Sequence, residues 1–473
     1  MFKRRSAASR RKPLVVALTL ALLAAAAAGG RWLWVAVHVG AGYASKVTCS
    51  LALNSGQEAG EVFRDYVARA IAPLGPAVRV SVSQDGAEAS VLGLVHVRAV
   101  YRRGLGCALL PDGDEERALP SGIELPRRTL DAAAPWPDGG GGSVVTPPPG
   151  IAAAIERAFR EPEPPEPGRV RQTKVVVVVR DGRLIAERYA PGYGPTTPML
   201  SWSMAKSVLA TVVGIAVADG RLGLRQPAPV PEWASPSDPR HGITLDQLLR
   251  MSSGLAFDEQ YGAVNDVSRM LFTMPDTGAF AAAKPLAAPP DTQWSYSSGT
   301  SNVIARVLRD SFGGDLAALV RYANERLFDP VGMTSAFFET DASGTPIGSS
   351  FVFMTARDWA RLGELHRLDG MWKGQRILPE GWVRYVTTPT PAAPDGCYGA
   401  HWWLNAGAAA DRSHRPWPGL PTEAYAARGY SGQYVVVVPS EKLVVVRLGL
   451  SFPDDGNDGT PELIADVIRA LQT

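Results

Sequence analysis

Two runs of branched residues determine the predicted fold: KVVVVVRDGRLIAERY at residues 174–189 and QYVVVVPSEKLVVVRLGL at residues 433–450. Val and Ile favour strands, and Asp181-Gly182 favours a tight turn, so each run indicates a pair of neighbouring strands. A helical pattern, PELIADVIRALQ, follows the second run. Strands at both ends of one long segment predict a single antiparallel sheet that the two ends of the segment close.

Between these runs the sequence is mostly helical in pattern. Apolar residues recur at helical spacing in residues 244–254, 301–312, 315–328 and 356–368, and each pattern ends at Gly or at another break. We therefore expect an α/β (α+β) fold in which helices flank the antiparallel sheet and an all-helical subdomain is inserted into it. A site is expected in the groove between these two parts.

A smaller unit precedes this domain. Residues 46–130 combine a helical pattern at 61–74 with strand-like runs at 78–83 and 90–101, which predicts a small α+β domain. Residues 131–150 are rich in Gly and Pro, which is typical of a linker. The main domain then spans residues 151–473.

The N-terminus has the pattern of an export or anchoring segment. Residues 1–12 are basic and residues 14–28 are apolar and uncharged, as in a signal peptide. The apolar character resumes at residues 32–39, so residues 1–40 could instead form an uncleaved membrane anchor with its basic end in the cytoplasm. A twin-arginine pair at Ser9-Arg10-Arg11 also hints at export, although Pro13 stands where that signal favours an aromatic residue. Either route predicts a periplasmic or cell-surface protein.

Composition excludes several classes of partner. A net charge of +2 is no basic excess for a chain of this length and gives no support for nucleic-acid binding. The cysteines form no C-x-x-C pair and the histidines form no H-E-x-x-H, so we predict no metal and no cofactor. An oxidising compartment favours a disulfide between Cys49 and Cys107, with Cys397 left as a buried thiol; three reduced core cysteines are the alternative. The oligomeric state is left open.

The stretch WSMAKS holds a candidate nucleophile and its base. Ser203 and Lys206 lie three residues apart at the start of a helix, so both side chains share one face. A lysine whose pKa burial has lowered can take the proton of a serine hydroxyl. The alternative is a capping serine beside a solvated lysine, but Trp202, Met204 and Val208 would surround the lysine with apolar atoms. Ser9-Arg10-Arg11-Lys12 has the same spacing, so spacing alone is not specific.

Two further stretches supply what acyl transfer needs. Tyr296, in WSYSSGTSN, could pass a proton to the leaving group, although a Tyr in such a loop is more often a packing residue. In GYSGQYVVVV, Tyr430-Ser431-Gly432 precedes a strand whose backbone N–H groups could stabilise an oxyanion.

These stretches together resemble the serine β-lactamase and penicillin-binding protein superfamily. They occur in the order of its S-x-x-K, Y-x-N and K-T-G elements, and ITLDQLLRMSSGL, GSSFVFMTARDWARLGELHRLDGMWKGQRILPEGWV and GQYVVVVPSEKLVVVRLG are similar to the class C branch. Within it, the nylon-oligomer (6-aminohexanoate-dimer) hydrolase and esterase-like group is the most similar. The resemblance covers residues 151–473 and implies a β-lactamase/transpeptidase-like fold.

The resemblance implies roles for individual residues. Ser203 would be the acylated nucleophile, Lys206 its base and Tyr296 the proton relay. The oxyanion hole would be the N–H groups of Ser203 and Gln433. The remaining positions would contact substrate: Ser298, Tyr430, Ser431, Gly432 and Tyr261.

Two departures from the family pattern bear on the substrate. Ser298 replaces the Asn of Y-x-N, and Tyr430 replaces the Lys of K-T-G. The second change removes the cation that would hold a substrate carboxylate, which favours an ester or simple amide over a β-lactam or a D,D-peptide. We expect a serine hydrolase of small-molecule esters or amides; the alternatives are a catalytically silent, membrane-tethered binding or sensor protein, or a β-lactamase or D,D-peptidase proper. Labelling of Ser203 by an acylating probe separates enzyme from binder.

Overall fold

A computed structural model describes residues 11–472 except 111–118, 127, 141, 143 and 263, with the backbone only for residues 11–26. Its centre is a six-stranded antiparallel sheet in the order β12-β13-β14-β15-β5-β6. The strands, in chain order, are β5 (Thr173–Arg180), β6 (Arg183–Tyr189), β12 (Trp403–Leu404), β13 (Tyr425–Gly429), β14 (Gln433–Val438) and β15 (Leu443–Gly449). β15 pairs with β5, so the two ends of the main domain close the sheet as the sequence predicts.

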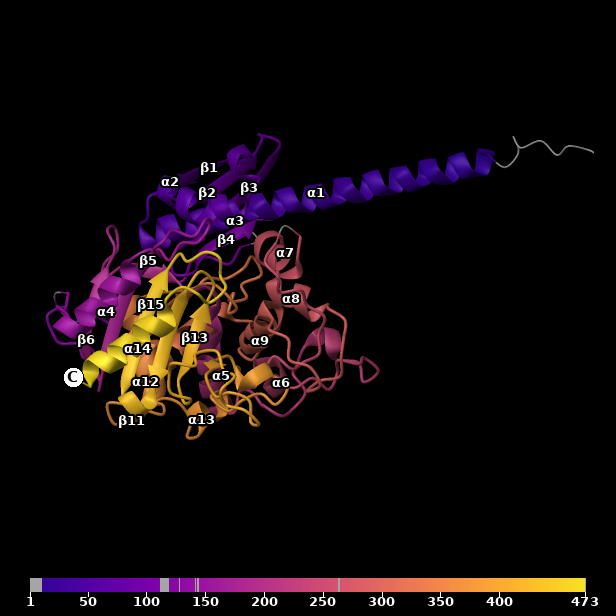
Figure 1. Ribbon diagram of the computed structural model, residues 1–473. Coiled ribbons are helices and arrows are strands. Elements are labelled where there is room, and N and C mark those ends of the chain that lie inside the picture. Colours follow the sequence, from indigo (N-terminus) through magenta and orange to yellow (C-terminus); the bar gives the residue numbers. More distant parts are fainter. Residues whose placement is uncertain are drawn as a thin grey trace, which may run out of the picture.

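The valine runs bury both faces of this sheet. Val175, Val177 and Val179 face one core cluster, whereas Val176 and Val178 face the other, because side chains alternate along a strand. The second face is covered by α4 (Pro149–Phe159) and α14 (Thr460–Leu471), and the first by α12 (Ala356–Arg367). Figure 1 shows α14 in front of the strands and α12 behind them. The result is a three-layered domain with the nucleophile helix on the α12 side.

The helical subdomain lies beside the sheet in Figure 1. It is inserted between α5 (Ala205–Ala218) and the helix α12. Its helices are α6 (Leu245–Leu249), α7 (Asp266–Thr273), α8 (Thr277–Ala282), α9 (Ser298–Asp310), α10 (Leu316–Ala323) and α11 (Asp329–Val331). A small sheet of β7 (Pro198–Leu200), β9 (Val352–Thr355) and β8 (Phe337–Phe338) leads into the nucleophile turn. The remaining short elements are β10 (Met371–Trp372), β11 (Gln375–Arg376) and α13 (Trp382–Val386).

The N-terminal unit differs from the expectation in two ways. One continuous helix, α1 (Arg11–Ser55), replaces the predicted boundary near residue 46, and its residues are buried from Val39 to Leu51. It packs on a four-stranded sheet, in the order β1-β2-β3-β4. The run at 90–101 is not one strand but parts of two, because the chain turns at Leu92-Gly93 with positive φ at both residues.

The bounds in this unit are α2 (Ala59–Val62), the π-helical turn Phe63–Val67, α3 (Ala68–Ala70), β1 (Val78–Ser83), β2 (Gly86–Val91), β3 (Val95–Arg102) and β4 (Gly106–Leu110). The unit shares one continuous hydrophobic cluster with the main domain, so it is part of the same packed body.

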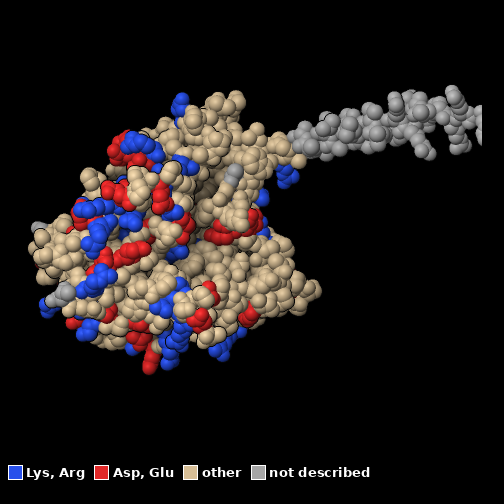
Figure 2. All heavy atoms as spheres, viewed as in Figure 1, with Lys and Arg blue, Asp and Glu red and all other residues tan. Residues whose placement is uncertain are grey.

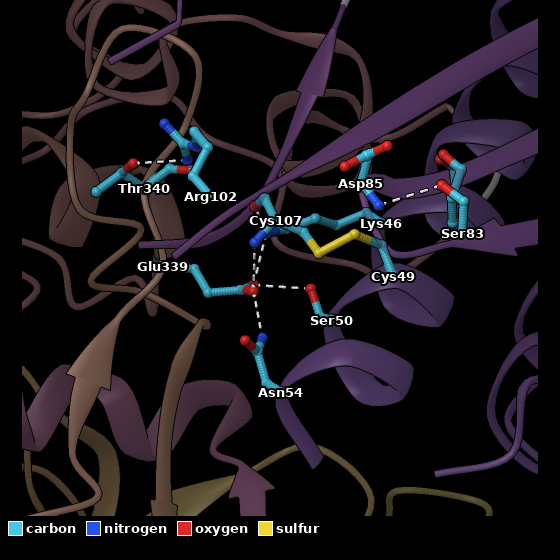
Figure 3. The surroundings of a disulfide bond; sticks show 12 residues. Lys46, Cys49, Ser50, Asn54, Ser83, Asp85, Arg102, Cys107, Glu339 and Thr340 are labelled. Carbon is cyan, nitrogen blue, oxygen red and sulfur yellow. Dashed lines mark hydrogen bonds and ion pairs between the residues drawn. A yellow bond between two sulfur atoms is a disulfide. The ribbon is translucent and has the colours of Figure 1, made fainter. Parts of the chain in front are cut away.

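A disulfide and a buried ion pair join the unit internally and to the main domain. Cys49 of α1 and Cys107 of β4 are bonded, as Figure 3 shows. Beside them, Lys46 donates to Glu339 of the main domain at 2.6 Å, and both side chains are almost fully buried. Glu339 also accepts hydrogen bonds from Ser50, Asn54 and the N–H of Cys107. With every acceptor direction of the carboxylate occupied, the pair fixes α1 and β4 on the main domain.

The predicted linker is attached to the main domain. Trp136 is buried, and its indole N–H donates to the carbonyl of Arg357 at the start of α12. Arg361 donates to the carbonyl of Gly139 at 2.6 Å, and Arg357 donates to that of Gly140. Apart from Pro149 and Gly150, which begin α4, the described residues of this segment form no helix or strand, but these contacts hold it on α12. Composition predicted only a linker. It could not reveal these contacts, because the residues of α12 that make them lie far along the chain.

The predicted anchor covers residues 1–40. Residues 1–10 fall outside the described part of the chain, and α1 leaves the body of the molecule toward them (Figure 1). Within the residues whose side chains are described, no helix combines the length and the apolarity needed to cross a membrane.

Candidate active site

The nucleophile candidate lies in a strained turn. Trp202 to Met204 form a short 3₁₀ turn that runs into α5, and Trp202 has φ of 44°, in the left-handed region that a bulky residue avoids. Its ring is packed between Phe351 and Tyr430, with centroid distances of 5.9 and 5.5 Å. This packing holds the strained backbone and fixes the position of Ser203.

Lys206 lies one turn along and contacts the serine. Its Nζ donates at 3.0 Å to Ser203 Oγ, at 3.0 Å to Ser298 Oγ and at 3.0 Å to the carbonyl of Ser349. The side chain is 1% exposed, and α5 is buried on nearly every side. Burial lowers the pKa of Lys206 to about 8, although the carboxylate of Glu259 opposes that shift. None of its three contacts is a carboxylate, so near neutral pH the amine can give up its proton and act as a base.

A glutamate behind Ser298 completes a hydrogen-bonded row. Ser298 donates to Glu259 through its hydroxyl at 2.5 Å and its backbone N–H at 2.7 Å. Burial raises the pKa of Glu259, and the charge of Lys206 opposes this. Ser298 is fully buried, so it is not the substrate contact that the family pattern implies. It is a positioning residue that links Glu259 to Lys206.

Tyr296 faces the pair from the loop before α9. Lys206 Nζ lies 4.7 Å from the centre of its ring. Burial raises the pKa of Tyr296, and a hydrogen bond with Ser203 acts in the opposite direction. The ring packs against Trp294, Tyr398 and Trp403, which orient the phenol toward the serine. The structure therefore brings together the three residues predicted to carry the chemistry.

A groove of about 230 Å³ opens over Ser203. Its far wall is the end of β13, a strand missed in the sequence because YAARG lacks a branched run. A side chain at Gly429 would lie 2.3 Å from the carbonyl of Ser201 and 3.1 Å from the backbone N of Ser203. Only glycine allows this strand to approach the nucleophile turn so closely. Tyr430 follows directly and also lines the groove.

Charged and aromatic side chains form the rest of the groove. Arg428 and Asp454 line it with their charged atoms 3.9 Å apart, and the Arg428 guanidinium lies 5.6 Å from the ring centre of Trp403. Tyr261 stacks on Tyr430 with ring centroids 5.3 Å apart and is 39% exposed. Tyr261 and Tyr430 thus lie where the family pattern places substrate contacts.

Three other predicted residues are not in the groove. As predicted, Tyr430 to Gly432 directly precede a strand, β14, and they form the turn that joins it to β13. Gln433 lies on β14, where its side chain donates to the carbonyls of Tyr430, Ser431 and Gly449, so its role is to hold the turn. Gly432 has no side chain because Arg447 occupies that space, and no substrate contact is needed to explain it.

Comparisons with known proteins identify the family of the chain. A family model described as Beta-lactamase matches residues 153–467, more than half of the chain. The chain belongs to the beta-lactamase family. A 6-aminohexanoate-dimer hydrolase from Paenarthrobacter ureafaciens is 27% identical over 331 residues, which are 63% of this chain and 79% of that relative.

Solved structures of this beta-lactamase family and its neighbours show the same fold. A penicillin-binding protein homologue from Caulobacter crescentus has a TM-score of 0.53 at 16% identity over 69% of this chain and 98% of its own. A family VIII carboxylesterase has a TM-score of 0.52 at 14% identity, again over 69% and 98%. At such identities the likeness concerns the fold alone. The predicted fold class and the family resemblance are confirmed.

Two residues of the groove carried no signal in the sequence of this beta-lactamase family member. Glu259 stands beside Asp258 in a loop, and Arg428 stands in a strand without an apolar pattern. Only the tertiary fold distinguishes them from solvated charges. As for metals, the described residues contain no cluster of three or more His, Cys, Asp or Glu side chains that could hold an ion.

Proposed function

We propose that this beta-lactamase-family hydrolase cleaves small-molecule esters or simple amides through an acyl-enzyme on Ser203. One observation carries the proposal: the amine of Lys206 is buried, lies 3.0 Å from Ser203 Oγ and contacts no carboxylate directly. A buried amine with a lowered pKa, within hydrogen-bond reach of a hydroxyl, is the arrangement that activates a serine.

In the proposed acylation, Lys206 takes the proton of Ser203 while Oγ bonds to the substrate carbonyl carbon. The oxyanion is stabilised by two backbone N–H groups, those of Ser203 and Tyr430, in place of the predicted Gln433. The close approach of Gly429 to the nucleophile turn supports this choice. Tyr296 delivers a proton to the leaving alcohol or amine as the bond to the carbonyl carbon breaks. Water then attacks the acyl carbon and gives a proton to the tyrosinate of Tyr296. As the bond between the acyl carbon and Oγ breaks, Lys206 returns its proton to Ser203, and the acid is released.

The test is covalent trapping combined with a substrate panel. Full-length protein is incubated with a fluorophosphonate, and the modified peptide is identified by mass spectrometry. We expect one adduct on Ser203, none in Ser203→Ala and an unchanged adduct in the surface control Ser235→Ala. Turnover of p-nitrophenyl acetate should likewise be lost in Ser203→Ala and kept in Ser235→Ala. No adduct with any acylating probe and no turnover of short esters or linear amides would establish the silent binding protein instead.

A substrate with a carboxylate is the second candidate. The structure places Arg428 in the groove, so the site does hold a cation despite the Tyr at position 430. Asp454, whose carboxylate lies 3.9 Å from that guanidinium, offsets its charge, which favours a neutral ester or amide over a β-lactam or D-Ala-D-Ala peptide. Comparing kcat/KM for neutral and carboxylate-bearing esters in the wild type and Asp454→Asn separates the two. A strong preference for carboxylates in the wild type would support the second candidate.

We further propose that the protein acts outside the cytoplasm and is attached to the membrane by its N-terminal segment. The support is the basic and then apolar sequence of residues 1–28, together with the buried Cys49–Cys107 disulfide, which is typical of an oxidising compartment. Fractionation of cells that express the full chain tests this. Recovery in the membrane fraction with a protease-accessible main domain is expected, and a soluble cytoplasmic product with reduced thiols would contradict it.

A further inference from the structure

A second, apolar cavity adjoins the catalytic groove. It has a volume of about 370 Å³ and lies between α1, the turn after α3 and the main domain. Leu33, Ala36 and Val39 of α1 form one wall, and Ile71 and Leu74 form another. Phe272 of α7 closes the inner side. This volume is within the range of small-molecule sites in proteins.

The cavity and the groove share a wall. The stacked rings of Tyr261 and Tyr430 line both spaces. Trp202, which directly precedes the nucleophile, also lines the cavity. A group bound covalently at Ser203 therefore needs only to pass the edge of this tyrosine pair to enter the cavity. Tyr261 belongs to a loop without helix or strand and is partly exposed, so that edge is at the surface of the groove.

The two spaces differ in chemistry. The groove carries Glu259, Arg428 and Asp454, whereas Arg69 is the single charged side chain among the described residues that line the cavity. Its guanidinium lies 5.1 Å from the ring centre of Phe452, so it is partly engaged by that aromatic ring. The other lining side chains are aliphatic or aromatic, apart from the hydroxyl of Ser268. Such a space favours an uncharged hydrocarbon chain, because binding there removes the apolar surface of the chain from water.

The outer end of the cavity opens where α1 leaves the body. Trp32 and Leu33 line it there and are each 54% exposed. Figure 2 shows mostly uncharged atoms, with a few Lys or Arg side chains, where the helix leaves the body. An elongated ligand could thus run from the solvent side of α1 to the tyrosine pair with apolar contacts along its length.

We propose that this cavity binds the linear apolar acyl chain of an ester substrate whose carbonyl lies at Ser203. The inference rests on the proposed function and gives it a substrate class: the acid released is a medium- or long-chain carboxylic acid. The N-terminal unit then has a role in specificity, because α1 and the turn after α3 supply most of the wall. The chain could come from a free ester or from a membrane lipid, and both share this chemistry.

The test compares p-nitrophenyl acetate with p-nitrophenyl octanoate, both below their micelle concentrations. We expect kcat/KM for octanoate to exceed that for acetate by about ten-fold or more, since the longer chain removes apolar surface from water. Ala36→Trp and Leu74→Trp fill the cavity from opposite walls, and each should lower the octanoate-to-acetate ratio about ten-fold. The control is Trp34→Ala, an exposed tryptophan on α1 that does not line the cavity; its ratio should stay that of the wild type.

The outcomes are distinguishable. If acetate is hydrolysed but both cavity-filling variants keep the wild-type ratio, the acyl-chain site is wrong and the serine hydrolase stands. If no ester is hydrolysed and Ser203 forms no adduct, the proposed function itself fails. Fatty acid release from phosphatidylcholine vesicles, measured in the wild type and in Ala36→Trp, identifies the source. If the wild type releases fatty acid from the vesicles and Ala36→Trp does not, the substrate is a bilayer lipid. If Ala36→Trp lowers the octanoate-to-acetate ratio but no fatty acid is released, the substrate is a free ester. Each result supports the site.

Discussion

Two lysines are buried to the same extent and serve different purposes. Lys206 and Lys46 are each 1% exposed, and burial lowers the pKa of both. Lys46 contacts the carboxylate of Glu339 directly, at 2.6 Å, whereas Lys206 contacts two hydroxyls and a carbonyl. The carboxylate nearest to Lys206, on Glu259, is separated from it by the hydroxyl of Ser298.

The difference shows how one residue type serves as anchor and as base. A direct ion pair keeps an ammonium charged and makes its partner costly to lose. One intervening hydroxyl weakens that attraction, so the neutral amine becomes accessible near neutral pH. The same interior thus holds a structural lysine and a reactive one, and the position of the nearest carboxylate decides which is which.

The largest expected effect is on catalysis. Lys206→Met keeps the length of the side chain but removes the base, so kcat/KM for p-nitrophenyl acetate should fall by about 10²- to 10⁴-fold. Steady-state kinetics with the purified variant measure this. Lys46→Met is the matched control and should retain near-normal kcat/KM per folded molecule. Equal losses of kcat/KM in both variants would show that removing any buried lysine lowers the activity, so that Lys206 need not be the base.

The second effect is on stability, and here the loss of Lys46, not of Lys206, has the larger consequence. Lys46→Met leaves the carboxylate of Glu339 buried without its cation, so the free energy of unfolding should decrease by about 3–5 kcal/mol. Denaturant titration followed by circular dichroism measures it. The double variant Lys46→Met/Glu339→Leu removes both charges and should recover part of the loss. A double variant less stable than the single one would contradict the role of the ion pair.

The third effect concerns the disulfide beside Lys46. It closes a loop across a sequence separation of 58 residues. Replacing both cysteines by serine should lower the free energy of unfolding by about 2–4 kcal/mol through the greater freedom of the unfolded chain. Chemical denaturation with and without a reductant provides the measurement. If reductant leaves the stability of the wild type unchanged, the disulfide does not stabilise the N-terminal unit.

The smallest effect is a shift in pH dependence. Ionised Glu259 favours the charged form of Lys206, so Glu259→Gln should lower the pKa of that lysine further. The neutral base then forms at lower pH, and the midpoint of the kcat/KM profile should move to the acidic side of about 8, by one pH unit or less. A shift to the alkaline side would mean that Glu259 does not act through the charge of Lys206.

The sequence was most informative where the chemistry is local. Ser203 and Lys206 share one turn, and the valine runs specify two strand pairs with their own turns, so each could be identified without knowing the rest of the fold. Glu259 could not, because its partner Ser298 lies 39 residues along the chain. Strand β13 also escaped detection, since its sequence YAARG has no branched run and forms a strand by pairing with β12 and β14, which lie elsewhere in the chain.

The N-terminal half shows the same limit. Helical pattern continues through residues 41–55, but the composition of the preceding apolar run suggested a boundary there. The actual continuity of α1 depends on its packing against β2, β3 and α7, which are distant in sequence. Likewise, Trp136 turns a Gly- and Pro-rich stretch into an attached segment only because α12 offers a carbonyl to its indole.

The most direct test of the difference between the two lysines is the pH dependence of Ser203 acylation. The rate of fluorophosphonate labelling is measured from pH 6 to pH 10 in the wild type, Lys46→Met and Lys206→Met. A base on Lys206 predicts a rate that rises through about pH 8 in the first two proteins and a slow, flat profile in the third. The same rise in Lys206→Met would contradict the assignment of the base.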